Sequence, residues 1–312
     1  MKSVNFPAAR KEQIKFVLSR LNQLQPQSEV DKYAIGQNTL FFESIRSIPR
    51  YINWLYGLRK NIRSEDLLEI NELLPELDEI FHEKMAEIER RPRPGIIRPV
   101  VDYITDLIRS TPPSKRFRIT SLGSGSMEAE RQVIERLQQM GNTNRLTIVG
   151  FDIAPKARAY AEKNLHSLSG VRVIQEAGLT GKRLAELEYE TKEQVLIVVS
   201  NNDIFTLSLD FAPHTFDLAM TALFLHHLHE ATRTMLVKNM RDIAPQTLNY
   251  DGYQNEVVIP LLSLTGWHSP VFLNAAIFST IRFPTRTEVS GLHEGAQITF
   301  YNHGHYRATF ST

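Results

Sequence analysis

The sequence of 312 residues contains no cysteine. Disulfide bonds, thiolate metal sites and cysteine nucleophiles are therefore excluded. It also has almost no net charge, because 36 basic side chains are balanced by 35 acidic ones. A protein that binds a nucleic-acid backbone usually carries a broad positive field, so we expect no nucleic-acid partner.

Long apolar runs are missing as well. No stretch approaches the roughly 20 apolar residues of a membrane-spanning helix, and the first residues lack the apolar core of a signal peptide. Hydrophobic residues nevertheless make up 42% of the chain, a proportion ordinary for globular proteins. We therefore expect a soluble, cytoplasmic protein with a sizeable core and no membrane span.

The N-terminal part has the apolar spacing of helices, from Glu12 to about Ile88. Prolines 26, 49 and 75 should divide it into several helices rather than one rod. The arginine- and proline-rich run 90–95 then forces extended backbone. We predict an all-helical cap or dimerisation region over 1–95, through which a homodimer would form, and a second domain over 96–312.

After residue 115 the pattern changes to short β-branched runs that alternate with amphipathic helices. Such alternation predicts right-handed βαβ units and a parallel sheet. The chain ends with two runs, 287–292 and 296–310, which we predict to be an antiparallel hairpin around His293-Glu294-Gly295. The predicted fold is α/β, a doubly wound, mostly parallel seven-stranded sheet with a C-terminal antiparallel hairpin. The other predicted strands are 117–122, 146–151, 195–200, 216–221 and 257–264, and the predicted helices of this region are 96–108, 129–140 and 156–168.

A glycine turn follows the first predicted strand, as Gly123-Ser124-Gly125-Ser126. At the first strand-to-helix turn of such a sheet, residues without a side chain let a ligand approach the backbone. Asp152 ends the second strand, 29 residues after Gly123 (152 − 123). A carboxylate there can accept hydrogen bonds from both hydroxyls of a ribose, so the pattern predicts a nucleoside site.

The position of Glu128 helps to choose the nucleoside. A dinucleotide pyrophosphate needs a third glycine at this position, where the helix begins. A carboxylate in its place would repel the pyrophosphate, which disfavours a nicotinamide-dependent oxidoreductase. An adenosine ligand that carries a sulfonium and an amino acid has no phosphate to repel.

Four segments together resemble the class I S-adenosylmethionine-dependent methyltransferases. They are Ile119–Ser126, Gly150–Asp152, Asn201–Ile204 and Phe216–Leu228, and the last of them contains Leu225-His226-His227-Leu228. The resemblance covers about residues 96–312. It implies a Rossmann-like catalytic domain, S-adenosylmethionine as the cofactor and methyl transfer as the activity.

The resemblance also implies roles for particular residues. Gly123 and Gly125 would lie against the methionine part and the nearby sugar, Asp152 would bind the ribose, and Asp203 would sit by the adenine amino group. The full implied cofactor-binding set is Gly123, Ser124, Gly125, Ser126, Asp152, Ile153, Asn202, Asp203, Ile204 and Ala222. The family often has an acid where this chain has Ser121 and a small residue where it has Met127. The methionine amino group is therefore expected to be held through backbone or water.

Two segments compete for the third strand of the sheet, 171–175 and 195–200. We prefer 195–200, because Asp203 then precedes the strand at Phe216 by an interval typical of the family. Residues 171–193 become an insertion under this interpretation.

Histidines gather at the end of the fourth predicted strand, as His226, His227 and His229. They lack a convincing set of partner ligands, since His303 and His305 belong to a distant segment, and we predict no metal site. A neutral histidine could instead remove a proton from the acceptor, which makes His226 and His227 the candidate catalytic residues. The alternative is that both cap a helix and pack beside the cofactor.

The sequence thus predicts an enzyme that transfers a methyl group to an oxygen, nitrogen or carbon atom of a small organic acceptor. The acceptor pocket, or simple packing, would use Trp267, His268, Phe272, Phe278, Phe283, Tyr51, Trp54 and Tyr56. Two rivals remain: a non-catalytic scaffold that keeps the fold, which Ser121 and Met127 favour, and an NAD(P)-dependent oxidoreductase.

Overall fold

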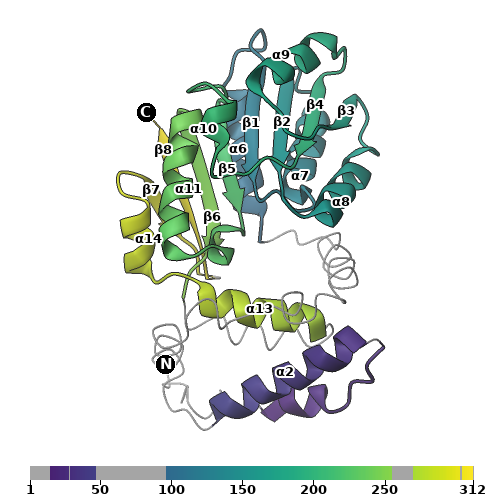
Figure 1. The fold of residues 1–312 in the computed structure, drawn as a ribbon, viewed down its shortest axis with the longest axis vertical. Helices are drawn as coiled ribbons and strands as arrows, with labels where there is room; N and C mark the ends of the chain where they lie inside the picture. Colours follow the sequence, from purple (N-terminus) through teal and green to yellow (C-terminus); the bar gives the residue numbers. More distant parts are fainter. Residues whose placement is uncertain (1–14, 28, 47–95, 255–269, 303, 312) are drawn as a thin grey trace. The chain divides into compact units, whose positions relative to one another are not determined.

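A computed structural model describes residues 15–27, 29–46, 96–254, 270–302 and 304–311 (Figure 1). By its internal contacts the chain divides into two compact units, each drawn from several stretches of sequence. The first unit is Met1–Ile88, Gly252–Thr287 and Tyr301–Gly304, and the second is Glu89–Asp251, Glu288–Phe300 and His305–Thr312. The division into domains at residue 95 stays a prediction.

The second unit is built on a sheet of eight strands in the order β3-β4-β2-β1-β5-β6-β8-β7. Along this order, each strand from β3 through β6 is parallel to its neighbour. β7 and β8 pair antiparallel. The predicted fold class, a mostly parallel doubly wound sheet with a C-terminal antiparallel hairpin, is confirmed. The strands are β1 (Phe117–Leu122), β2 (Leu146–Phe151), β3 (Val171–Gln175), β4 (Val195–Ser200), β5 (Leu218–Ala222), β6 (Gln246–Gly252), β7 (Gln297–Phe300) and β8 (His305–Ser311).

Both candidates for the third strand form strands, which helps to explain why the sheet has more strands than predicted. β4 pairs with β2 along its whole length, as the preferred assignment expects. β3 pairs with the other side of β4 and is an additional edge strand. The sequences fit these places, because β4 is uniformly buried whereas β3 is only half-buried and carries Arg172 and Gln175.

Two segments near the C-terminus differ from the prediction, and a third is not described. β6 forms where no strand was predicted, and the predicted strand 257–264 lies outside the described residues. Residues 287–292, predicted as a strand, belong to helix α14 (Arg286–Leu292). The negative charge of Glu288 in the first turn of α14 interacts favourably with the helix dipole. Gly295, at φ +77°, then turns the chain into β7. The hairpin connection is therefore 301–304 and not His293-Glu294-Gly295.

The helices form layers on the two faces of the sheet. One core cluster joins Leu122, Val149 and Val198 to apolar residues of α9, α10 and α11, so these helices share one face. α6 packs on α7, and α7 packs on α8. Figure 1 shows these elements around the sheet. The bounds are α6 (Arg98–Arg109), α7 (Glu128–Gln139), α8 (Pro155–Leu165), α9 (Gly181–Glu190), α10 (Leu207–Asp210), the 3₁₀ turn η3 (Leu225–His227) and α11 (Glu230–Ile243).

The first unit is helical in its described part. Residues 15–21 and α2 (Glu29–Arg46) are helices, as predicted, and α2 packs against α13 (Pro270–Arg282). The side-chain amide of Asn38 donates to the carbonyl of Pro270 at 2.9 Å, and that of Asn274 donates to Asn38 Oδ1 at 3.3 Å. The remaining predicted helices, over 47–88, lie outside the described residues. Among the residues that are described, no helix is both long enough and apolar enough to span a bilayer.

Candidate functional site

The predicted site residues lie along one edge of the sheet. β1, β2, β4, β5 and β6 run parallel, so their carboxyl ends meet at the same edge. This is the edge at which open α/β sheets bind ligands. The glycine turn follows β1, Asp152 follows β2, Asn202 follows β4 and His226 follows β5.

The glycine turn is held by the end of β2. The N–H groups of Gly123 and Ser124 both donate to the Phe151 carbonyl, at 2.9 and 3.1 Å. Gly123 and Gly125 have φ of +63° and +52°, a left-handed region that other residues enter only with strain. The backbone conformation of the turn therefore favours glycine at both positions.

The two glycines face different surroundings. A Cβ placed on Gly123 would lie 2.2 Å from Cδ2 of Phe224, so the aromatic ring packs directly on this residue. A Cβ placed on Gly125 would have no atom within 4 Å. The open space that a ligand could enter is therefore at Gly125, whereas Gly123 makes room for Phe224.

Asp152 ties this turn to the next loop. One carboxylate oxygen accepts the Gly125 N–H at 2.9 Å and the other accepts the Ala154 N–H at 2.9 Å. A carboxylate offers about four acceptor positions, so these two bonds leave capacity for two hydroxyl donors. The fixed orientation beside the open glycine suits the predicted ribose contact.

Ile153 follows Asp152 and is 88% exposed. Leu209 is almost equally exposed, at 84%, so exposure alone does not mark a site. The position of Ile153 beside Asp152 places an apolar surface next to the acid, where the flat face of a base would cover it.

Met127 and Gly150 explain one departure from the family pattern. Met127 is fully buried in the left-handed conformation, at φ +56°, as the residue before α7. A Cβ on Gly150 would lie 2.7 Å from its sulfur and 2.8 Å from Ser124 Oγ. The glycine in β2 therefore accommodates the methionine that replaces a small residue in the turn, and Ser124 directs its hydroxyl toward the strand.

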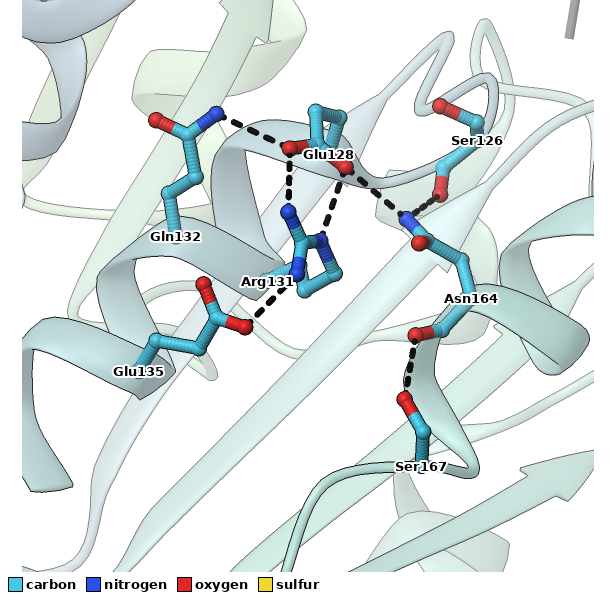
Figure 2. A network of polar contacts seen from close by, with 7 residues as sticks. All are labelled: Ser126, Glu128, Arg131, Gln132, Glu135, Asn164 and Ser167. Carbon is cyan, nitrogen blue, oxygen red and sulfur yellow. Dashed lines mark hydrogen bonds and ion pairs between the residues drawn. The ribbon is translucent and has the colours of Figure 1, made fainter. Parts of the chain in front are cut away.

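The first turn of α7 is anchored to α8 by Glu128 (Figure 2). Its carboxylate accepts from Arg131 at 2.8 and 2.9 Å, from Gln132 at 2.9 Å and from Asn164 at 3.2 Å. Burial opposes ionisation, but these bonds outweigh it and lower the pKa of Glu128. Because Arg131 balances its charge, Glu128 repels a pyrophosphate less than the sequence suggests.

The side chains that follow β4 make hydrogen bonds and packing contacts within the protein. Asn202 accepts from Leu179 N at 2.8 Å and Ser200 Oγ at 2.6 Å, and donates to Leu179 O at 2.9 Å and Asp210 at 2.8 Å. Its side chain therefore stabilises the loop. Asp203 is exposed and accepts the Phe205 N–H at 2.9 Å, while Ile204 packs against the core.

His226 is paired with an acid that the sequence analysis did not identify. Its Nδ1 lies 2.7 Å from Oδ1 of Asp251, and its backbone N–H donates to Oδ2 at 2.9 Å. The two side chains are 5% and 1% exposed. If Asp251 is ionised, Nδ1 donates and the neutral ring carries its lone pair on Nε2, which is the arrangement of a histidine oriented to take a proton.

The other histidines of the cluster have different roles. His227 is exposed, and its ring lies 4.1 Å from that of His226 between centroids. His229, rather than His226 or His227, caps α11, because its Nδ1 accepts the Ala231 N–H at 3.4 Å. Arg233 donates to the carbonyls of His226 and Leu228, at 3.2 and 2.8 Å, and so fixes the turn.

Within the described ranges, no three histidine, aspartate or glutamate side chains are placed to hold a metal ion. His303 lies outside these ranges, and His305 stacks on Tyr250 with ring centroids 5.4 Å apart. The absence of a metal site stays a prediction.

The predicted acceptor pocket lies only partly within the described structure. Phe283 is buried, and its ring would lie 2.1 Å from a Cβ on Gly252, so it contributes to packing. The side chains of Phe272 and Phe278 are not described. Tyr51, Trp54, Tyr56, Trp267 and His268 lie outside the described residues.

No protein-family model matches the chain, and no curated protein sequence matches it. The crystal structure of the CurJ carbon methyltransferase is similar with a TM-score of 0.54 and 11% identity, over 98% of this chain and 92% of that one. The plantazolicin methyltransferase BpumL, solved in complex with SAH, is similar with a TM-score of 0.50 and 12% identity, over 83% and 98%. The chain therefore has the fold of the S-adenosylmethionine-dependent methyltransferases, as the sequence predicted.

Proposed function

We propose that the protein is an S-adenosylmethionine-dependent methyltransferase that acts on a small organic acceptor. The observation that carries the proposal is the position of a buried histidine–carboxylate pair, His226 and Asp251, on the same sheet edge as the open glycine turn and Asp152. The glycine turn and Asp152 suit the binding of a nucleoside, and the His226–Asp251 pair suits the removal of a proton. The fold shared with known methyltransferases supports the assignment of both features to one methyltransferase site.

The residues at the glycine turn fit the cofactor. Asp152 has acceptor capacity for the ribose hydroxyls, Gly125 leaves space beside it, and Ile153 offers an exposed apolar face for the adenine. Asp203 would reach the adenine amino group, and Ser126 and Ala222 would border the site. Bound S-adenosylmethionine would supply an electrophilic methyl group on sulfur.

His226 would prepare the acceptor. Methyl transfer chiefly needs a nucleophile about 3 Å from the methyl group and in line with the breaking bond. A base is required only when the nucleophile must lose a proton, as a hydroxyl or an activated carbon does. The burial and orientation of His226 by Asp251 favour such an acceptor, and CurJ, one of the structural neighbours, is a carbon methyltransferase.

We infer that the first unit, in which α2 packs against α13, serves the choice of a small acceptor, because it is the part of the chain that the Rossmann-like sheet does not require. A dimer through the N-terminal helices, and a cytoplasmic location, belong to the same proposal.

Calorimetric titration of the full chain tests the proposal directly. S-adenosylmethionine and S-adenosylhomocysteine should bind, and NADH should not. Formation of S-adenosylhomocysteine with a panel of small hydroxyl and carbon acids should then be lost in His226→Ala, while His226→Ala still binds the cofactor. Binding of NADH alone would favour the oxidoreductase, and binding of the adenosyl ligands without turnover of any acceptor would favour a scaffold.

A further inference from the structure

Arg233 is a buried arginine beside the proposed base. It comes from α11 and is 7% exposed, whereas most arginines lie at the surface of folded proteins. Its Nε donates to the carbonyl of Leu228 at 2.8 Å, and its Nη2 donates to the carbonyl of His226 at 3.2 Å. The positive charge therefore lies directly beside the residue whose ring would take the proton.

His226 is held at both ends of its own backbone. Asp251 of β6 accepts its N–H at 2.9 Å and lies 2.7 Å from its ring Nδ1, while Arg233 of α11 binds its carbonyl. The turn η3 that carries the ring is thus fixed by a strand on one side and a helix on the other. A neutral donor would also bind a carbonyl, and burying a charge costs free energy, so the guanidinium charge itself calls for an explanation.

Two opposite charges act on the surroundings of the proposed base. Burial raises the pKa of Tyr306 on β8 well above its usual range, the charge of Asp251 raises it further, and the charge of Arg233 opposes both. One side chain therefore senses the acid and the arginine together. Tyr306 is uncharged at neutral pH, and so is its partner His293 of α14, because burial lowers the pKa of that ring to about 4.

The acid and the arginine have opposite effects on the ring of His226. A carboxylate beside a histidine favours the imidazolium, which has no lone pair with which to take a proton. The guanidinium disfavours it, and the effect is strong because both groups are buried. His227, whose ring lies 4.1 Å from that of His226, would act in the same sense when protonated, but it is exposed and solvent screens its charge.

We propose that Arg233 is a positioning residue for His226: it fixes the turn that carries the ring, and its charge offsets that of Asp251, so that the ring stays uncharged until it meets the acceptor. This inference rests on the proposed function and deepens it. The acceptor then gives its proton to the ring and its electron pair to the methyl group, and the sulfur leaves with the electrons of the bond that breaks. Arg233 acts on this step only through His226.

NMR of ¹⁵N-labelled histidines in the ligand-free full chain tests the charge effect without any acceptor. The signals of His226, assigned by their loss in His226→Gln, should show an uncharged ring in wild type at neutral pH. In Arg233→Gln the titration of this ring should move to higher pH, because the charge that opposes the imidazolium is gone. Arg233→Lys keeps the charge and should titrate as wild type does.

The pH profile of the reaction tests the consequence. With a hydroxyl or carbon acid that wild type methylates, Arg233→Gln should form S-adenosylhomocysteine about 10- to 100-fold more slowly at neutral pH, within the range that a general base contributes. Its rate should recover as the pH rises, and its affinity for S-adenosylhomocysteine should stay as in wild type. Arg233→Lys should be slower without a shift of the profile, because lysine cannot reproduce two directed hydrogen bonds.

Arg241→Gln is the matched control. Arg241 lies on the same helix, also donates to a backbone carbonyl, that of Glu294 at 2.9 Å, and loses one positive charge in the same way. It should leave the titration of His226 and the pH profile as they are in wild type. A shift as large as that of Arg233→Gln would show that any nearby charge has this effect, and the specific role of Arg233 would be lost.

The outcomes separate the two proposals. An unmoved titration of His226 in Arg233→Gln, or a rate lowered equally at every pH, would show that Arg233 is merely structural and would overturn its role. If Arg233→Gln does not fold, a charged His226 in wild type at neutral pH, or a wild-type rate in Arg233→Lys, would do so instead. If wild type methylates no acceptor, the proposed function fails and the role of Arg233 in it fails too, while the NMR titration still shows whether its charge acts on His226.

Discussion

The ring of Phe224 packs on the α-carbon of Gly123. An added Cβ would lie 2.2 Å from the ring at Gly123, whereas at Gly125 it would meet no atom within 4 Å. Both glycines have a positive φ, so both have the left-handed backbone conformation, and they differ in the atoms that surround them. This difference separates a packing role from a ligand-facing role within one turn.

Alanine at each glycine should therefore give different results. Gly125→Ala should cost about 1–2 kcal/mol, which is the strain of a left-handed alanine. Gly123→Ala should cost about 2–5 kcal/mol, because overpacking against the ring adds about 1–3 kcal/mol. Urea unfolding measures both values.

A second substitution checks the cause. In a Phe224→Ala background, the extra cost of Gly123→Ala over Gly125→Ala should largely disappear, because the ring is gone. Equal costs for the two glycines in the wild-type background would contradict the packing role. Gly125→Ala, although mild for folding, should weaken S-adenosylhomocysteine binding, because its methyl group enters the open space.

Asp152→Ala should weaken binding of S-adenosylhomocysteine by about 1.5–3 kcal/mol, the range for hydrogen bonds to a charged group. The substitution also removes the acceptor of the Gly125 N–H, so a ligand control is needed. An analogue with a 2′,3′-dideoxyribose should bind wild type and Asp152→Ala with nearly equal affinity. Equal losses for the two ligands would show that Asp152 only shapes the turn.

The predictable part of the fold is the part in which sequence and burial agree. β2 and β4 are mostly apolar and are buried along their whole length, and the glycine turn follows β1, which is buried at all positions except Arg118. The ends of these runs are visible in the sequence, and in a parallel sheet they put Asp152 and Asn202 on one edge. The parallel register then brings Asp152 to within hydrogen-bonding distance of Gly125.

The part that could not be predicted depends on polar groups that are buried. β6 contains Asn249 and Asp251, residue types typical of loops, yet they are 1% and 0% exposed because Thr221 and His226 satisfy them. These partners lie 28 and 25 residues away in sequence, so local periodicity carries no sign of them. Without β6 there was no reason to place an acid beside His226.

Asp251→Ala should lower the free energy of unfolding by about 3–5 kcal/mol, the usual cost of breaking a buried charged pair. It removes the acceptor of both His226 Nδ1 and the His226 N–H. His227→Ala is the control, because His227 is exposed, and it should change stability by no more than about 0.5 kcal/mol. The ¹⁵N spectrum of wild type should show His226 protonated at Nδ1, and loss of that signal in Asp251→Ala would link the two effects. A stable Asp251→Ala would argue against the pair.

Glu130→Gln should make the ligand-free protein more stable at neutral pH. Because folding raises the pKa of Glu130, the folded protein keeps its proton to higher pH than the unfolded chain does. Its contribution is therefore full below the unfolded pKa and is lost as the pH rises through the folded value. The stability gap between Glu130→Gln and wild type should be small in acid and should grow toward neutral pH. Thermal unfolding over that range measures the gap, and a gap that did not change with pH would contradict the burial of an ionisable group.

The contribution of His293 to the stability of the folded protein depends on pH in the opposite sense, because it is lost as the pH falls. Its ring is 1% exposed, with Nε2 at 3.2 Å from the Tyr306 hydroxyl, and burial lowers its pKa from 6.5 to about 4, assisted by the charge of Arg241 and opposed by that of Asp251. For a base with a lowered pKa, the unfolded chain binds the proton first, so stability is full above 6.5 and is lost as the pH falls toward about 4. The loss should approach about 3 kcal/mol, at 1.36 kcal/mol for each pKa unit.

The contribution of His293 can be separated from that of the carboxylates by a pair of variants. His293→Gln keeps a polar partner for Tyr306 but cannot take up a proton in this range, so its stability should fall less than that of wild type between about pH 7 and pH 4. His166→Gln is the control, because the exposed side chain of His166 pairs with Glu162 at the surface, and it should follow the wild-type curve. Urea unfolding at several pH values gives both curves. If His293→Gln and wild type lost stability in parallel, the ring would have to be charged, or accessible to water, within the fold.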